Sequence, residues 1–309
     1  LYKQPPLHRH RACQESYIRE SGERFYKEGQ AAGRLNHPNI VQAIDVGEAG
    51  GYHYFVMEYV EGKTISDDIQ AGNIFTEAEA LEIIIQVANA LAHAHACNLI
   101  HRDVKPKNIM ISNSGVVKLA DMGLARGTSD IEAAQNEEGK AYGTPYFIAP
   151  EQIRGKIDID GRADIYGLGA TFYNMVTGRV PFMAENSADV MRKHLKEKLI
   201  PPDHINTALS AGISEVIEIM MAKRRENRYN NIEELLVDLK SLQEGKPPIQ
   251  AHRKFDVEAF AQLEEGEAVE SEEKEIDENV LSQYRMAIVI LSVVAVILLL
   301  MVVLQIVLK

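Results

Sequence analysis

The chain has 309 residues, of which 46% are hydrophobic and 25% are charged, a composition that can bury a sizeable core and excludes collagen-like, rod-like and wholly disordered proteins. A net charge of −12 argues against a nucleic-acid-binding surface. The two cysteines, Cys13 and Cys97, lack metal-ligand spacing and are typical of a reducing compartment.

The N-terminal part is predicted to begin irregularly and then to form a helix and two strands. Residues 1–20 are basic and carry no periodic apolar pattern. A helix is predicted over residues 22–35. Strand-like runs at residues 40–46 and 52–60 are separated by a glycine-containing turn at residues 47–51. This region therefore predicts a small sheet.

A long helix is predicted to follow Thr76, because Thr76 and Glu79 have the spacing of a capping box. The helical period then places five side chains on one face: Leu81, Ile84, Ala88, Leu91 and His95. Short strands are predicted next at residues 108–112 and 116–121. The sequence Asn113-Ser114-Gly115 between them indicates a hairpin turn.

The rest of the folded part is predicted to be mainly helical. A helix over residues 164–177 should end at Gly178. A later helix carries an apolar face formed by Ile232, Leu235, Leu236, Leu239 and Leu242. Strands followed by helices predict an α+β fold with a small sheet-containing part and a larger helical part.

The C-terminal residues predict an acidic linker and a membrane span. Residues 246–285 are interpreted as the linker, and residues 264–278 within it hold nine acids and one lysine, a charge of −8. Residues 286–308 contain no charge over 23 positions, and about 20 apolar residues suffice to cross a bilayer. The alternative is a buried core helix, which would normally show a polar face. Arg285 and Lys309 flank the run almost equally, so charge does not fix its orientation.

The residues with catalytic chemistry are concentrated in one stretch, His101-Arg102-Asp103-Val104-Lys105-Pro106-Lys107-Asn108. Asp121-Met122-Gly123 follows the second predicted hairpin strand, and Ala149-Pro150-Glu151 comes later. This order resembles the eukaryotic-type protein kinases, most closely the bacterial subgroup with a single membrane helix. The resemblance covers about residues 22–242. It implies a two-lobe kinase fold with a mainly helical large lobe.

The resemblance implies a role for each polar residue in the motifs. Asp103 would orient the substrate hydroxyl and accept its proton, and Lys105 would place positive charge against the transferring phosphate. Asn108 and Asp121 would hold Mg²⁺, which favours oxygen ligands. Taken singly, Asp103 could be a turn residue, Asn108 a strand cap and Asp121 the start of a loop. For the resemblance to be misleading, all three of these simpler interpretations would have to be true together.

The resemblance also implies an ATP site. Glu28 corresponds to the helix glutamate that pairs with the phosphate-binding lysine, although alone it would be a solvated helical residue. Met57 would be the gatekeeper, and backbone groups of Glu58 and Val60 would meet adenine. Met110 would pack below the adenine ring, and is equally at home in any core.

Several residues are implied to be structural supports and not catalysts. His101 is interpreted as a packed histidine. Asp164 would be the buried helix-start aspartate that anchors the catalytic loop, and Glu151 and Arg228 would form a buried ion pair. Lys105 and the sequence Gly143-Thr144-Pro145 follow the Ser/Thr-specific version of the family pattern, where tyrosine kinases place Ala and Arg in the catalytic loop.

The sequence departs from the family at its start. The glycine-rich phosphate loop should precede the Glu28 helix, yet the first glycine is Gly22. Lys3 could be a remnant of the lysine strand, but it lies 25 residues before Glu28. We therefore expect a fragment or a truncated gene product whose small lobe is incomplete.

The predicted organisation is an N-terminal remnant (1–20), a kinase domain (21–245, with a partial small lobe at 21–60 and a large lobe at 61–245), the linker and the span. The predicted function is a membrane-anchored Ser/Thr protein kinase that uses Mg-ATP and faces the cytoplasm, where ATP and reduced thiols occur. Its partners would be protein substrates, ATP and the membrane, and not nucleic acid. The alternatives are a catalytically weak pseudokinase acting as a tethered interaction module and, more remotely, an unrelated soluble domain on a membrane anchor.

Overall fold

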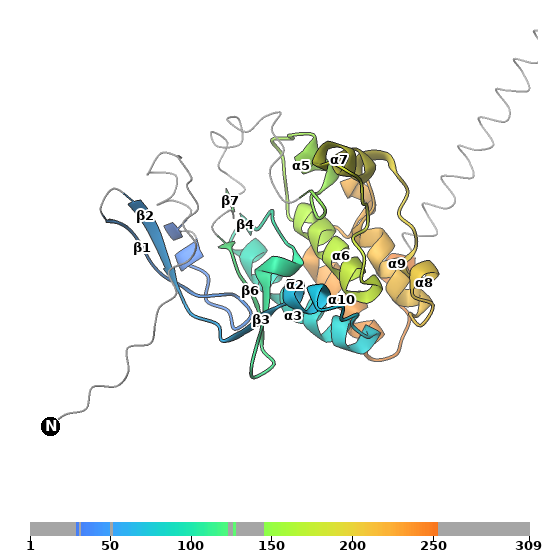
Figure 1. Cartoon of the computed structure of the whole chain (residues 1–309), viewed down its shortest axis with the longest axis horizontal. Coiled ribbons are helices and arrows are strands. Elements are labelled where there is room, and N and C mark those ends of the chain that lie inside the picture. The colour runs from blue at the N-terminus through green and yellow to red at the C-terminus, as the bar shows by residue number, and fades with distance from the viewer. Residues whose placement is uncertain (1–28, 31, 50–51, 123–125, 128–144, 253–309) are drawn as a thin grey trace, which may run out of the picture. The chain divides into compact units, whose positions relative to one another are not determined.

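Figure 1 shows the computed structural model of the chain, which describes residues 29–30, 32–49, 52–122, 126–127 and 145–252. These residues all lie within one compact unit. The predictions for Glu28, for residues 253–285 of the acidic linker and for the apolar run at 286–308 lie outside the described residues. Within the described ranges, no helix is long and apolar enough to cross a membrane.

The N-terminal elements are helical backbone at residues 29–30 and 32–33 and a two-stranded antiparallel sheet of β1 (Ala43–Ala49) and β2 (Tyr52–Met57). The predicted turn was wrong for residues 47–49, which pair with residues 52–54. Glycine and glutamate there are poor strand formers, but pairing with β2 overrides local propensity. The strand prediction for residues 52–60 holds only to Met57.

A second sheet of three antiparallel strands has the order β3 (Gly62–Thr64), β5 (Ile109–Ser112) and β6 (Val117–Leu119). The hairpin prediction is therefore confirmed. The segment before β1 hydrogen-bonds to the outer edge of β6. Val41 N donates to Leu119 O at 2.9 Å, and Leu119 N donates to Asn39 O at 2.8 Å. A short pair, β4 (Leu99–Ile100) with β7 (Arg126–Gly127), completes the described strands.

The remaining described elements are helices: α2 (Ile65–Gln70), α3 (Glu77–Ala96), η1 (Pro106–Asn108), α5 (Pro150–Ile153), α6 (Arg162–Thr177), α7 (Ser187–Lys196), α8 (Pro202–Ile205), α9 (Ala211–Met220), η3 (Arg225–Asn227) and α10 (Ile232–Gln243). The Thr76–Glu79 capping box is confirmed at the start of α3. A second capping box, from Thr64 and Asp67 at the start of α2, was missed because α2 is too short for a periodic signal.

Helix α6 forms the centre of the core. Every residue from Ala163 to Thr177 is buried, and α6 packs against α3, α8 and α9. Figure 1 shows α3, α6, α9 and α10 gathered together. The helix ends, as predicted, at Gly178, whose φ of +68° is the left-handed conformation that glycine adopts without a side-chain penalty. The α+β prediction is confirmed for the described residues.

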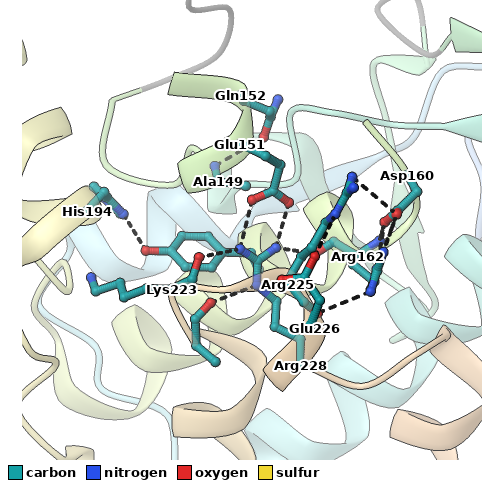
Figure 2. A network of polar contacts seen from close by, with 12 residues as sticks. Ala149, Glu151, Gln152, Asp160, Arg162, His194, Lys223, Arg225, Glu226 and Arg228 are labelled. Atoms are coloured by element: carbon teal, nitrogen blue, oxygen red, sulfur yellow. Dashed lines mark hydrogen bonds and ion pairs between the residues drawn. The ribbon is translucent and has the colours of Figure 1, made fainter. Parts of the chain in front are cut away.

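A buried ion pair links distant parts of the helical region (Figure 2). The two terminal guanidinium nitrogens of Arg228 donate to the Glu151 carboxylate, at 2.7 and 2.8 Å, and Arg228 has no exposed surface. Arg228 also donates to the carbonyl oxygens of Arg162 and Ala222, and its guanidinium lies 4.8 Å from the ring centre of Tyr166. The predicted pair is confirmed, and its hydrogen bonds compensate the cost of burying two charges.

A neutral histidine lies beside this pair. Nδ1 of His194 is 2.7 Å from the Tyr166 hydroxyl. Burial, followed by the charge of Lys223, lowers the pKa of His194 to about 3, whereas burial raises the pKa of Tyr166. Both groups are therefore neutral, and this buried contact carries no charge at neutral pH.

The segment after α10 packs back onto that helix. The Asp238 carboxylate accepts backbone hydrogen bonds from Ile249, Gln250 and Ala251 at 2.7–3.0 Å, and a further bond from the Tyr229 hydroxyl. Ala251 is fully buried. These residues belong to the start of the segment predicted as a linker, and they pack as part of the folded domain.

Candidate active site

The stretch with the candidate catalytic residues runs from β4 through η1 to β5, and one buried carboxylate holds its beginning. Asp164, in the first turn of α6, is 1% exposed. Its Oδ1 accepts from Arg102 N at 2.7 Å, and its Oδ2 accepts from His101 N at 2.9 Å and lies 2.8 Å from His95 Nε2. The predicted anchoring role of Asp164 is confirmed.

The charge of Asp164 is balanced by His95, near the end of α3. Burial opposes ionisation of Asp164, but the hydrogen bond with His95 and its charge outweigh burial and hold the pKa of Asp164 below its ordinary value. Burial likewise opposes protonation of His95, but the hydrogen bond and charge of Asp164 raise its pKa. The two residues therefore form an ion pair beneath the loop.

His101 connects the loop to the residue before Asp121. Its Nδ1 accepts from Asp103 N at 3.2 Å, and its Nε2 lies 3.0 Å from the carbonyl oxygen of Ala120. A carbonyl can only accept, so the ring carries its proton on Nε2. His101 is fully buried, which confirms that it is a structural histidine.

The structure brings Asp103, Lys105 and Asn108 together. The Lys105 ammonium contacts Oδ2 of Asp103, and Nδ2 of Asn108 donates to the Asp103 carbonyl oxygen at 2.9 Å. Asp103 and Asn108 are 7% and 6% exposed, so both are held by protein and not by water. Helix α6 approaches the loop closely at Gly167, where a Cβ would lie 3.0 Å from the Val104 carbonyl oxygen.

Asp121 is placed beside this group by backbone contacts of its neighbour. Ala120 N donates to the Asn108 carbonyl oxygen at 2.7 Å, and the Ala120 carbonyl oxygen contacts His101. Asp121 itself is exposed and has a φ of +66°, a left-handed conformation that costs a residue other than glycine about 1 kcal/mol. The next residue, Met122, is buried.

The residues predicted to meet adenine lie where β2 leads into β3. Met57 ends β2, and the connection through Glu58 and Val60 leads to Thr64, which pairs with Met110 on β5. These residues are half-buried except Val60, which is buried.

The Glu58 side chain is used structurally. Its Oε1 lies 2.6 Å from the Lys118 ammonium and accepts from Gln42 N at 3.1 Å. The Glu58 N–H donates to the Gln42 carbonyl oxygen at 2.9 Å, so the backbone carbonyl of Glu58 is the group that a predicted adenine contact would use. Glu28, the partner expected for a phosphate-binding lysine, lies outside the described residues.

Asn108 and Asp121 fit a magnesium ion by the chemistry of their donors. The Asn108 nitrogen is bound to the Asp103 carbonyl, so the amide oxygen is the end that remains for a ligand. Asp121 offers an exposed carboxylate. Amide and carboxylate oxygens are the hard ligands that Mg²⁺ takes in proteins.

Residues 9–238 match the family described as the protein kinase domain. The chain belongs to the protein kinase family. Within it, the similarity is to bacterial Ser/Thr kinases: 40% identity over 229 residues to the serine/threonine-protein kinase PknB of Mycobacterium tuberculosis, covering 73% of this chain and 36% of that protein. The resemblance predicted from the motifs is confirmed.

Two further bacterial kinases are similar to this chain to about the same extent. A probable serine/threonine-protein kinase of Clostridium perfringens (CPE1738) is 40% identical over 219 residues, covering 71% of this chain and 32% of that protein. A probable serine/threonine-protein kinase of Corynebacterium efficiens (CE0033) is 39% identical over 228 residues, covering 71% and 34%. The chain thus spans about a third of the length of these curated relatives.

Sequence reasoning missed two supports of the site. His95 was placed on a helix face, but its pairing with Asp164 joins residues 69 positions apart, which helical periodicity cannot reveal. Gln152 was passed over, although its amide contacts the Arg102 carbonyl oxygen at 2.8 Å. Its position after Ala149-Pro150-Glu151 could only have suggested a capping residue.

The pairing of His95 with Asp164 predicts a pH-dependent stability. Because folding raises the pKa of His95 above its ordinary value near 6.5, its contribution is complete below about pH 6.5 and is lost as the pH rises through the folded pKa. His95→Gln keeps a donor but not the charge. We expect it to reduce the free energy of unfolding by about 1 kcal/mol at about pH 6, and by much less at about pH 9.

Urea-induced unfolding at the two pH values measures this difference. Asp164 stays ionised throughout, because its pKa is lowered. The same change at the exposed His204 is the control for replacing a histidine away from Asp164. A destabilisation by His95→Gln that grows with pH would contradict the ion pair.

Proposed function

We propose that the protein is a Ser/Thr protein kinase that transfers the γ-phosphoryl group of Mg-ATP to serine and threonine hydroxyls of proteins. The observation that carries this proposal is the convergence of Asp103, Lys105 and Asn108 in a loop that Asp164 holds from below. Phosphoryl transfer requires mainly positioning and neutralisation of charge, and this group supplies a carboxylate, an ammonium and an amide oxygen for those tasks.

Asp103 is the residue proposed to act on the substrate hydroxyl. Its carboxylate orients the hydroxyl and accepts its proton as the oxygen bonds to the γ-phosphorus and the bond to the β-phosphate oxygen breaks. Lys105, in contact with the same carboxylate, places a positive charge beside the phosphoryl group as negative charge builds up on it.

Asn108 and Asp121 are the residues proposed to hold magnesium. When bound, Mg²⁺ neutralises charge on the phosphate oxygens. Asn108 is held by its side-chain nitrogen, which donates to the Asp103 carbonyl oxygen, and by its backbone carbonyl, which accepts from Ala120 N, the residue before Asp121. These contacts fix the orientation of the Asn108 side chain and leave its amide oxygen for the metal ion.

The adenine contacts remain proposals of the same kind. Backbone groups of Glu58 and Val60 would hydrogen-bond the base, Met57 would limit the depth of the pocket, and Met110 would pack against the ring. Glu28 would hold a lysine against the phosphates. The choice of Ser/Thr over Tyr is supported by Lys105 and by the names of the relatives.

We also propose that residues 286–308 anchor the protein in a membrane, with the kinase domain on the cytoplasmic side. The support is the 23-residue run without a charge, in which Ser292 and Gln305 are the clearly polar members, and the cytoplasmic location of ATP. The acidic residues at 264–278 would then separate the domain from a membrane surface, because anionic headgroups repel them.

The proposed catalytic base is tested with Asp103→Asn in the full-length protein. The variant should fold, since the Asn108 and His101 contacts use the backbone of residue 103, and phosphate transfer to a Ser/Thr peptide should fall at least about 100-fold. Glu82→Gln, on the exposed face of α3, is a control for loss of a charge and should retain activity. Equal transfer by the Asp103 variant and the wild type would sink the assignment, and no transfer by the wild type would favour an interaction module.

The proposed topology is tested by adding protease outside intact cells. The kinase domain should be spared until the membrane is permeabilised, because it would lie on the inner side. Cleavage within residues 29–252 of intact cells, detected by peptide mapping, would overturn the orientation.

A further inference from the structure

We propose that Gln152 is a positioning residue for phosphoryl transfer, because its side-chain amide holds the peptide group that joins Arg102 to Asp103. The proposal rests on the kinase function proposed above. It concerns a residue outside the Asp103–Asn108 loop and on a different element, α5.

Two of the hydrogen bonds of Gln152 join it to described residues and point in different directions. Its Oε1 accepts from Ala149 N at 3.1 Å, at the start of its own helix, and its Nε2 donates to the Arg102 carbonyl oxygen at 2.8 Å. The residue is 7% exposed, so water competes little for either bond. Figure 2 shows the first of these bonds, with Gln152 next to Glu151 and Ala149.

The bond to Arg102 acts directly on the orientation of Asp103. The Arg102 carbonyl and the Asp103 N–H belong to one planar peptide group. Gln152 holds the oxygen end of that plane, and His101 Nδ1 holds the N–H end at 3.2 Å. Because Asn108 also holds the Asp103 carbonyl oxygen at 2.9 Å, both peptide groups that flank Asp103 are held, and together they set the direction in which its side chain leaves the backbone.

The same bond offsets a local strain. Arg102 has a φ of +67°, which is unfavourable for a residue with a side chain. Asp164 holds its N–H at 2.7 Å and Gln152 holds its carbonyl at 2.8 Å. Without Gln152 the carbonyl of the strained residue loses this donor, and of the two contacts that hold the following peptide group only that of His101 Nδ1 remains.

Helix capping alone does not explain the amide. The bond to Ala149 N is the ordinary contact of a third-position Glu or Gln with the residue that starts a helix, and a carboxylate serves it equally well. Of these two bonds, the one to the Arg102 carbonyl needs a donor. Gln152→Glu therefore keeps the cap and removes the contact with the loop.

Kinetic measurements on the full-length protein distinguish the capping role of Gln152 from its role in holding the Arg102 carbonyl. Gln152→Glu should lower kcat about tenfold with the KM for Mg-ATP within about twofold, since Gln152 does not belong to the nucleotide site. Gln152→Met, which adds no charge, should lower kcat similarly. Gln243→Glu adds the same charge at the exposed end of α10 and should match the wild type.

A pH profile distinguishes positioning from general damage. Protonation of the introduced carboxyl would restore a donor to the Arg102 carbonyl, and burial raises the pKa of such a group. The ratio of kcat for Gln152→Glu to that of the wild type should therefore rise between about pH 8 and about pH 6, and the ratio for Gln152→Met should not.

Hydrogen exchange gives a readout that does not need phosphate transfer. The amide of Asp103 should exchange at least about tenfold faster in Gln152→Glu than in the wild type and Gln243→Glu. If Gln152→Glu has the same kcat and the same exchange rate of the Asp103 amide as the wild type, the positioning role is wrong. If exchange rises but the wild type transfers no phosphate, the kinase proposal fails and the hold of Gln152 on the loop stands.

Discussion

The site depends on one buried carboxylate, that of Asp164. A charged group with almost no exposure is stable only when every oxygen is hydrogen-bonded and an opposite charge is close. Two loop amides and the His95 ring meet that requirement. The contacts that offset the desolvation cost of burying Asp164 therefore also bind the chain before Asp103 to α6. The position of the proposed catalytic base is therefore a consequence of how the core is built.

Other contacts extend this constraint outward. The fully buried α6 supplies Asp164 at its start and Gly167 one turn later, where the helix meets the loop. His101 contacts the carbonyl oxygen of Ala120, the residue before Asp121. Gln152 links the Arg102 carbonyl oxygen to α5. Glu151 and Arg228 then hold α5 against the segment before α10. The residues proposed to be catalytic and their structural supports thus form one connected network, in which only the former would touch substrate.

Local signals in the sequence were sufficient for much of the fold. The capping box at Thr76 and the glycine at 178 marked helix ends correctly, because both depend on residues within one turn. Residues 47–49 were misassigned because their conformation is decided by pairing with β2 and not by their own preferences. The motif around Asp103 indicated the family, but the partners of Asp164 and Gln152 are distant in sequence and could only be seen in the structure.

The central claim is that Asp164 positions Asp103, and the kcat of Asp164→Asn in the full-length protein tests it most directly. Asparagine offers one acceptor oxygen where Asp164 serves two loop amides and His95, so at least one amide would lose its acceptor. At saturating Mg-ATP and peptide, with folding verified by circular dichroism, the account predicts a kcat at least about tenfold lower and a nearly unchanged KM for Mg-ATP. A folded variant with wild-type kcat would contradict the account.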